Sequence, residues 1–202
     1  MGGVTDGGTD QGTDDAVDDG AVGGSPGRAE TVAAELGEVA IDAGVDDSEV
    51  STRAEVDGGV VVGHDGSGCS TEALVWAAAL AERAGWPLHV VRAWRMVTAP
   101  KPPTWEPGYV PPMADYEQAV LTDLRSDVAA ALGAGRAGAV TCHVVHTAAV
   151  HALVEAGEHA DVLVVGSRGR GGFAGLLLGS VSEECIRHAP CPVTVVRTHR
   201  EG

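Results

Sequence analysis

The feature that most limits the fold is a regular alternation of short β-branched apolar runs with alanine-rich stretches. The apolar runs lie at residues 60–62, 87–94, 139–146, 161–166 and 191–197. They are nearly continuous rather than alternating with polar residues, which is typical of strands covered on both faces. Helical patterns occupy the intervening segments 70–84, 115–132, 148–156 and 180–188.

Strands that are separated by helices require crossover connections, and these produce a mostly parallel sheet. We therefore predict an α/β fold, a doubly wound five-stranded parallel sheet with helices on both faces. Between the second strand and the second helix, residues 95–113 contain six prolines, so we expect a long irregular loop there.

The N-terminal part of the chain differs in composition from the rest. Residues 1–57 hold 15 acidic residues and two arginines. We predict that residues 1–27 are disordered, that residues 29–43 form a short helix with Val32 and Leu36 on one stripe, and that residues 44–57 are an acidic linker. The predicted division is thus an acidic, mostly disordered extension over 1–57 and a domain over 58–199. We expect removal of the extension to leave stability nearly unchanged.

The formal net charge of −16 excludes several classes of partner. Clustered basic residues, which bind nucleic acid or anionic membrane surfaces, are lacking. No apolar stretch is long enough to cross a bilayer, and no secretory leader is recognisable. We expect a cytoplasmic protein without nucleic-acid or membrane partners. Its four cysteines form no CxxC pair and are expected to be reduced thiols.

A glycine-rich segment, "VVGSRGRGGFAGLLLGS" (164–180), follows the fourth predicted strand with the spacing G-x2-G-x9-G-S. Such a segment is compatible with a simple flexible loop. It is also typical of a phosphate cradle, because glycines let backbone amides approach an anion and a helix start favours phosphate. Ser180 and Ser182 add hydroxyls, and Arg168 and Arg170 add positive charge. In open α/β sheets, ligands bind beyond the carboxyl ends of the strands, where Asp65 also lies.

The stretches "VVVGHDGS", "LHVVRAW" and "ADVLVVGSRGRGGFAGLLLGSVSEECIRHAPCPVTVV" together resemble the universal stress protein family of the nucleotide-binding type, over residues 58–198. The resemblance implies an adenine-nucleotide alpha hydrolase-like fold. It also implies that ATP binds between the first and fourth strands, with or without Mg²⁺. Asp65 then corresponds to the acidic residue on the nucleoside, and Ala93 lies against adenine. The expected residues around ribose and phosphates are Gly166, Arg168, Gly169, Gly179, Ser180, Val181 and Ser182.

One stretch departs from the family pattern. Family members often carry a glycine and a proline before the third helix, where this chain has "HTAAVH" (146–151). We expect this difference to affect the affinity for the ligand more than the fold. Family members also commonly pair through the fifth strand, so we expect a homodimer through residues 191–197, where an apolar edge strand would otherwise stay exposed.

We predict an ATP-binding regulator or sensor of the stress response rather than a metabolic enzyme. No general base is identifiable, so any ATP hydrolysis or self-phosphorylation is expected to be slow. One alternative is a nucleotide-free dimerising scaffold of the same fold. Another is a related ATP-hydrolysing or adenylate-forming enzyme, but Asp65 alone is a poor set of ligands for Mg²⁺.

Other patterns favour structural roles. Cys142, His143, His146 and His151 do not converge, because neighbouring residues of a strand face opposite sides. His64, Asp65, Ser67 and Cys69 are too close in sequence to form a catalytic triad. The loose G-x-G-x-x-A at Gly169 lacks the acidic partner of a dinucleotide fingerprint, and the chain has no P-loop.

Overall fold

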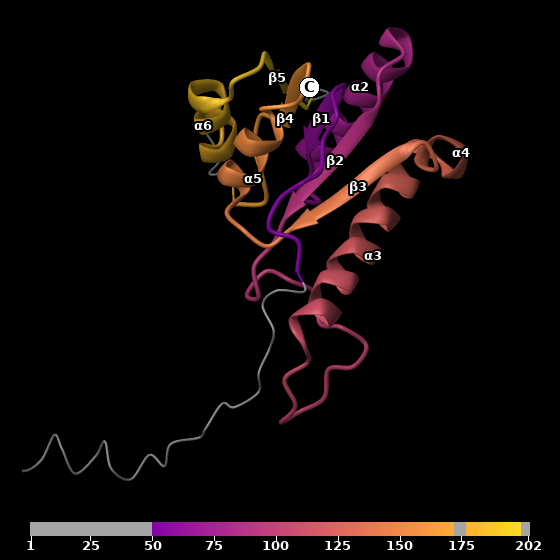
Figure 1. Ribbon diagram of the computed structural model, residues 1–202, viewed down its shortest axis with the longest axis vertical. Helices are drawn as coiled ribbons and strands as arrows, with labels where there is room; N and C mark the ends of the chain where they lie inside the picture. The colour runs from indigo at the N-terminus through magenta and orange to yellow at the C-terminus, as the bar shows by residue number, and fades with distance from the viewer. Residues whose placement is uncertain (1–49, 172–176, 199–202) are drawn as a thin grey trace, which may run out of the picture. The chain divides into compact units, whose positions relative to one another are not determined.

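Five parallel strands form one sheet in the computed structural model, which describes residues 50–171 and 177–198 (Figure 1). The strands are β1 (Val60–Gly63), β2 (Leu88–Ala93), β3 (Val140–Val145), β4 (Val162–Gly166) and β5 (Val193–Val196). Their order is β3-β2-β1-β4-β5, which confirms the predicted fold class. The expectations for residues 1–27, 29–43 and 44–49 lie outside the described residues.

The chain moves outward from β1 to β3 and then returns to the other side of β1. Val60 of β1 is consequently in register with Leu88 of β2 on one side and with Val162 of β4 on the other. The direction of the strand order reverses between β1 and β4, and such a switch point is where open α/β sheets bind ligands.

The helices cover both faces of this sheet (Figure 1). They are α2 (Gly68–Ala84), α3 (Met113–Leu132), the short α4 (Ala134–Ala137), α5 (Ala149–Ala156) and α6 (Ser180–His188). Val60 and Val62 pack with Leu74 of α2 and Leu124 of α3. The alternate residue Val61 faces the opposite side, in a cluster with residues of α5 and α6. No helix among the described residues has the combination of length and apolar character that a membrane span requires.

Helix α2 begins two residues earlier than the sequence predicted. The Ser67 hydroxyl accepts a hydrogen bond from the Ser70 amide at 3.3 Å and caps the helix. The hydroxyls of Ser70 and Thr71 donate to the Ser67 carbonyl. Several consecutive hydroxyl residues offer equivalent caps, so the start of the helix depended on the loop that precedes it.

Residues 50–57, here called the N-terminal arm, contact the domain rather than behaving as a linker. Val50 and Ala54 are each only 7% exposed, whereas the side chains of Glu55 and Asp57 are largely exposed. The Ser51 carbonyl accepts a hydrogen bond from the His146 amide at 2.8 Å. The Ser51 amide donates to Glu117 of α3 at 2.7 Å. The sequence prediction relied on the acidic composition of this segment and overlooked Val50 and Ala54, which are spaced so that both can be buried.

We therefore revise the expected effect of truncation. Removing residues 1–57 should lower the melting temperature by roughly 5 °C relative to removing residues 1–49 alone, because the longer deletion exposes core surface and loses both Ser51 hydrogen bonds. Thermal unfolding followed by circular dichroism would compare the two truncated proteins. Equal melting temperatures would show that the arm contributes no stability.

Candidate functional site

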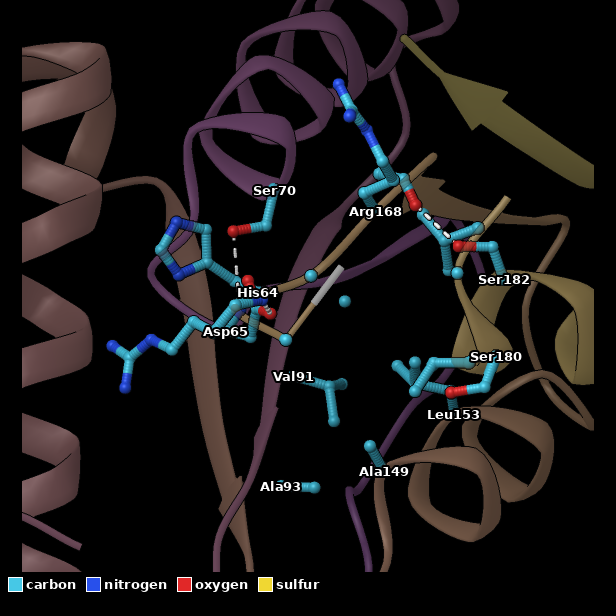
Figure 2. A pocket seen from close by; sticks show the side chains of 18 residues that line it. His64, Asp65, Ser70, Val91, Ala93, Ala149, Leu153, Arg168, Ser180 and Ser182 are labelled. Atoms are coloured by element: carbon cyan, nitrogen blue, oxygen red, sulfur yellow. Dashed lines mark hydrogen bonds between the residues drawn. The ribbon is translucent and has the colours of Figure 1, made fainter. Parts of the chain in front are cut away.

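A cavity of about 550 Å³ lies at the carboxyl ends of β1, β2 and β4 (Figure 2). The last residues of these strands, Gly63, Ala93 and Gly166, line it. Helix α5 contributes Ala149 and Leu153 to its wall, and α6 contributes its first turn. The cavity thus lies at the switch point of the sheet, as the topology predicts.

All nine residues that the sequence singled out for nucleotide binding line this one cavity. They are Asp65, Ala93, Gly166, Arg168, Gly169, Gly179, Ser180, Val181 and Ser182. The structure therefore brings together three segments that are far apart in the sequence. The part each residue plays in binding stays a prediction.

Apart from Ala93 and Val181, sequence reasoning missed the aliphatic part of the cavity. Figure 2 shows Val91, Ala93 and Ala149 around one end, and Arg168 and Ser182 around the other. Val91 and Leu153 look like ordinary core residues in the sequence, so no local signal could reveal their position. A cavity with an aliphatic end and a polar end can hold a ligand that has a flat ring at one end and an anionic group at the other.

The Asp65 carboxylate is held by backbone donors from two segments. Its Oδ1 accepts a hydrogen bond from the Ser67 amide at 3.0 Å, and its Oδ2 accepts one from the Arg170 amide at 3.0 Å. Burial acts to raise its pKa, but the hydrogen bonds from Ser67, Ser70 and Arg170 outweigh this and keep the pKa of Asp65 below its ordinary value. Asp65 is therefore a fixed, ionised acceptor at neutral pH.

Two glycines of the glycine-rich segment are needed because other parts of the protein approach them closely. A Cβ on Gly166 would lie 2.7 Å from the carbonyl carbon of Cys69, at the start of α2. A Cβ on Gly169 would lie 2.6 Å from Asp65 Oδ2. The absence of side chains lets the two loops meet beside the cavity.

Helix α6 begins beside the cavity at Ser180, with Gly179 as the capping residue and no side-chain cap. Its first-turn amides are thus available to an anion. The Ser182 hydroxyl has a different role from the one expected, because it is buried and donates to the Gly166 carbonyl at 2.6 Å. Ser182 consequently ties α6 to the end of β4, and Ser180 is the residue of this pair with an exposed side chain.

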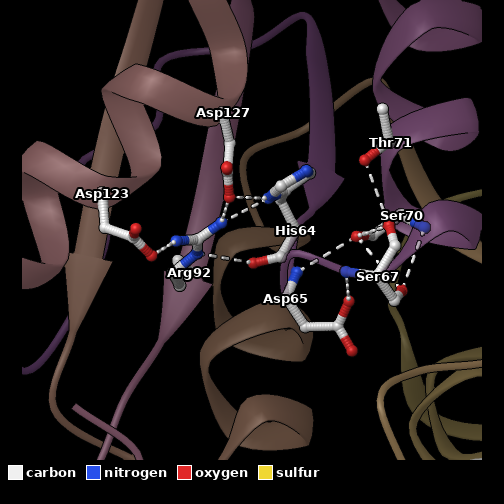
Figure 3. Close-up of polar contacts among 8 residues, drawn as sticks. All are labelled: His64, Asp65, Ser67, Ser70, Thr71, Arg92, Asp123 and Asp127. Atoms are coloured by element: carbon white, nitrogen blue, oxygen red, sulfur yellow. Dashed lines mark hydrogen bonds and ion pairs between the residues drawn. The ribbon is translucent and has the colours of Figure 1, made fainter. Parts of the chain in front are cut away.

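Behind the Asp65 loop lies a buried polar group that the sequence did not predict (Figure 3). Arg92 of β2 contacts His64, Asp123 and Asp127. Burial, together with the neighbouring Arg92 charge, lowers the pKa of His64 from 6.5 to about 4. The imidazole is therefore neutral at physiological pH.

The histidines that suggested a metal site lie apart. His143 pairs with His89 of β2, with Nε2 and Nδ1 3.0 Å apart. His146 instead packs against Trp94, with ring centroids 4.5 Å apart and ring planes tilted by 40°. Within residues 50–171 and 177–198, no three His, Cys, Asp or Glu side chains are grouped so as to hold a metal ion.

The topology and the cavity at the switch point define a doubly wound α/β protein with a ligand site at the carboxyl edge of its sheet. The sequence model of the Universal stress protein family matches residues 59–197. The chain belongs to the universal stress protein family, as the resemblance predicted.

Two curated relatives of this chain come from mycobacteria. Universal stress protein Rv2623 of Mycobacterium tuberculosis is 37% identical over 145 residues, which cover 68% of this chain and 47% of that protein. Universal stress protein Mb2028c of Mycobacterium bovis is 36% identical over 145 residues, covering 69% and 48%. The chain spans about half the length of the curated relatives it matches. Among solved structures, a universal stress protein in complex with cAMP is 30% identical, with a TM-score of 0.46, and the match covers 74% of this chain and 99% of that one.

Proposed function

We propose that this protein binds ATP in the cavity at the switch point and acts as a regulator or sensor of the stress response. The observation that carries the proposal is the convergence of Asp65, the glycine-rich segment and the start of α6 on one cavity. Family membership supports the same function.

Each part of the cavity suits one part of the nucleotide. In this proposal, adenine lies at the aliphatic end against Ala93, where its ring is removed from water. Asp65 accepts hydrogen bonds from the ribose hydroxyls, since each carboxylate oxygen keeps acceptor capacity beside its backbone donor. The phosphates lie at the Gly169 amide and at the start of α6, where Arg168 adds charge.

The site is better suited to binding than to rapid hydrolysis. Asp65 is the one carboxylate among the described residues of the cavity, and its lowered pKa makes it a weak base. A protein-built Mg²⁺ site usually has more than one hard oxygen ligand, so this donor set does not fit one. In our proposal, any Mg²⁺ arrives with the phosphates, and hydrolysis or self-phosphorylation is slow.

Calorimetric titration of the purified full chain with ATP tests this function. We expect saturable binding of one ATP per chain, and native mass spectrometry of the untreated protein should detect co-purified nucleotide. Titration with triphosphate alone is the control for non-specific anion binding, and it should give much weaker binding. The nucleotide-free scaffold would be favoured if no nucleotide co-purifies and no binding is detected with ATP at up to about 1 mM. A dissociation constant of that size corresponds to a binding free energy of only about −4 kcal/mol.

We also propose that the protein forms a homodimer through β5. This strand lies at one edge of the sheet. The carbonyls of Pro192 and Val196 accept hydrogen bonds from β4 and its extension. Backbone groups alternate in direction along a strand, so those of Val193 and Val195 point to the free edge, where a second copy of the strand can pair.

Substitution of Val195 by proline should convert a dimer to a monomer without removing a hydrogen bond to β4, because only the outward amide is lost. Val195→Lys adds a charge at the same edge and should weaken pairing as well. Sedimentation velocity at micromolar protein would measure the species present. A monomeric wild-type protein, or dimeric variants at both substitutions, would contradict this interface.

A further inference from the structure

Arg92 is a charged side chain buried beside the candidate site without lining its main cavity. Its side chain is 7% exposed, at the carboxyl end of β2. Burial of a guanidinium carries a large desolvation cost, and a buried ion pair is often no more stabilising than apolar side chains of the same volume. Stability of the core is therefore a weak explanation for an arginine at this position.

The contacts of Arg92 connect α3 to the loop that carries Asp65 (Figure 3). Nε donates to the His64 carbonyl at 3.2 Å, and Nη2 lies 2.6 Å from His64 Nδ1. Nη1 donates to Asp123 at 2.8 Å, and Nη2 donates to Asp127 at 2.5 Å. Because a guanidinium has only donors, His64 Nδ1 accepts and its proton is on Nε2.

Asp65 lies between two anchors. On one side, the preceding residue, His64, is held by Arg92 at both its carbonyl and its ring. On the other side, the Ser67 amide and the Ser70 hydroxyl hold the carboxylate and the amide of Asp65. The His64 amide is also held, because it donates to the Val91 carbonyl at 3.0 Å. Arg92 holds the carbonyl of the same residue, which leads directly into Asp65. Both anchors together fix where the carboxylate lies in the cavity.

We infer that Arg92 is a positioning residue, which holds the His64 carbonyl and so aims the Asp65 carboxylate at the ribose hydroxyls of the bound nucleotide. This inference deepens the proposed function and rests on it. Its consequence is selectivity: Arg92 should determine how strongly the site prefers a ribonucleotide to the analogue that lacks both hydroxyls.

The test compares binding of ATP and 2′,3′-dideoxy-ATP to the full chain. We expect the wild-type protein to bind ATP about 10-fold more tightly than dideoxy-ATP, because only ATP can donate ribose hydroxyls to the charged Asp65 carboxylate. In Arg92→Met, which keeps the aliphatic stem, the preference should fall to about twofold while dideoxy-ATP binds nearly as in the wild type. Arg92→Lys retains the positive charge but lacks the planar set of guanidinium donors, so its preference for ATP should lie between those of the wild type and Arg92→Met.

A general loss of stability must be separated from a loss of positioning. Val128→Ala removes buried volume from α3 next to Asp127, and it should lower the melting temperature without changing the ratio of the two affinities. Asp65→Ala should abolish the preference, and adding Arg92→Met to it should change nothing more, since both substitutions remove one interaction. An unchanged preference in Arg92→Met and Arg92→Lys would overturn the inference.

A second readout needs no ligand. In the free protein, Arg92→Met should accelerate hydrogen exchange at the Ser67 amide, which donates to Asp65. Val128→Ala should not accelerate it when both variants are measured at temperatures equally far below their own melting temperatures. If the wild-type chain binds no ATP, the proposed function fails, and this exchange experiment still decides whether Arg92 holds the loop. Equal exchange in both variants would exclude a positioning role.

Discussion

Replacing Gly169 with valine is expected to weaken ATP binding by at least about 100-fold, equivalent to roughly 2.7 kcal/mol. The added Cβ would lie 2.6 Å from Asp65 Oδ2, so the carboxylate must leave its position. The branched side chain would also cover the amide that is proposed to face phosphate. Gly169 is exposed, so the fold should remain intact by circular dichroism, and calorimetry measures the loss.

Gly171 provides the matched control within the same segment. A Cβ at this position meets nothing within 4 Å, so Gly171→Ala should bind ATP as the wild type does. Gly179→Val should have a smaller effect than Gly169→Val, because a Cβ there comes no closer than 3.4 Å, to the Cα of Arg168. Wild-type affinity in Gly169→Val would refute the proposed phosphate cradle.

Acidification is expected to destabilise the protein through His64. Its pKa is about 4 in the folded protein and near 6.5 in an unfolded chain. Between these values the unfolded state binds more protons, so stability is complete above pH 6.5 and falls as the pH decreases toward 4. The loss should be roughly 1 kcal/mol at pH 5.5 and about 3 kcal/mol near pH 4.

Urea unfolding at pH 7.5, 6.5 and 5.5 would measure this dependence. His64→Gln should be less stable at neutral pH. Its free energy of unfolding should also change less steeply with pH, because the contribution of His64 is lost. Arg92, Asp127, Asp65 and Arg170 also act on this imidazole, so the comparison of slopes isolates His64 better than the absolute stability does. A variant with the wild-type slope would show that His64 does not titrate as expected.

Much of the fold could be predicted from the sequence, because its signals are local. The valine runs of β1 and β4 and the helix signals around α2 and α6 report on neighbouring residues only, and crossover rules convert their order into a parallel sheet. Glycine spacing and the position of Asp65 after the first strand were enough to predict which loops meet. The resemblance to the universal stress protein family supplied individual positions such as Ala93, and all nine predicted residues line one cavity.

Tertiary structure alone decided the rest, because the contacts involved join residues distant in the sequence. Arg92 is one of two polar residues in the otherwise apolar strand β2. Only the packing of α3 on the sheet brings Asp123 and Asp127 to it. Val50 and Ala54 lie in an acidic stretch, and burial against the domain makes them core residues. Composition and periodicity indicate the secondary structure that a segment prefers. Which distant residues it contacts depends on the surfaces that the assembled sheet leaves uncovered.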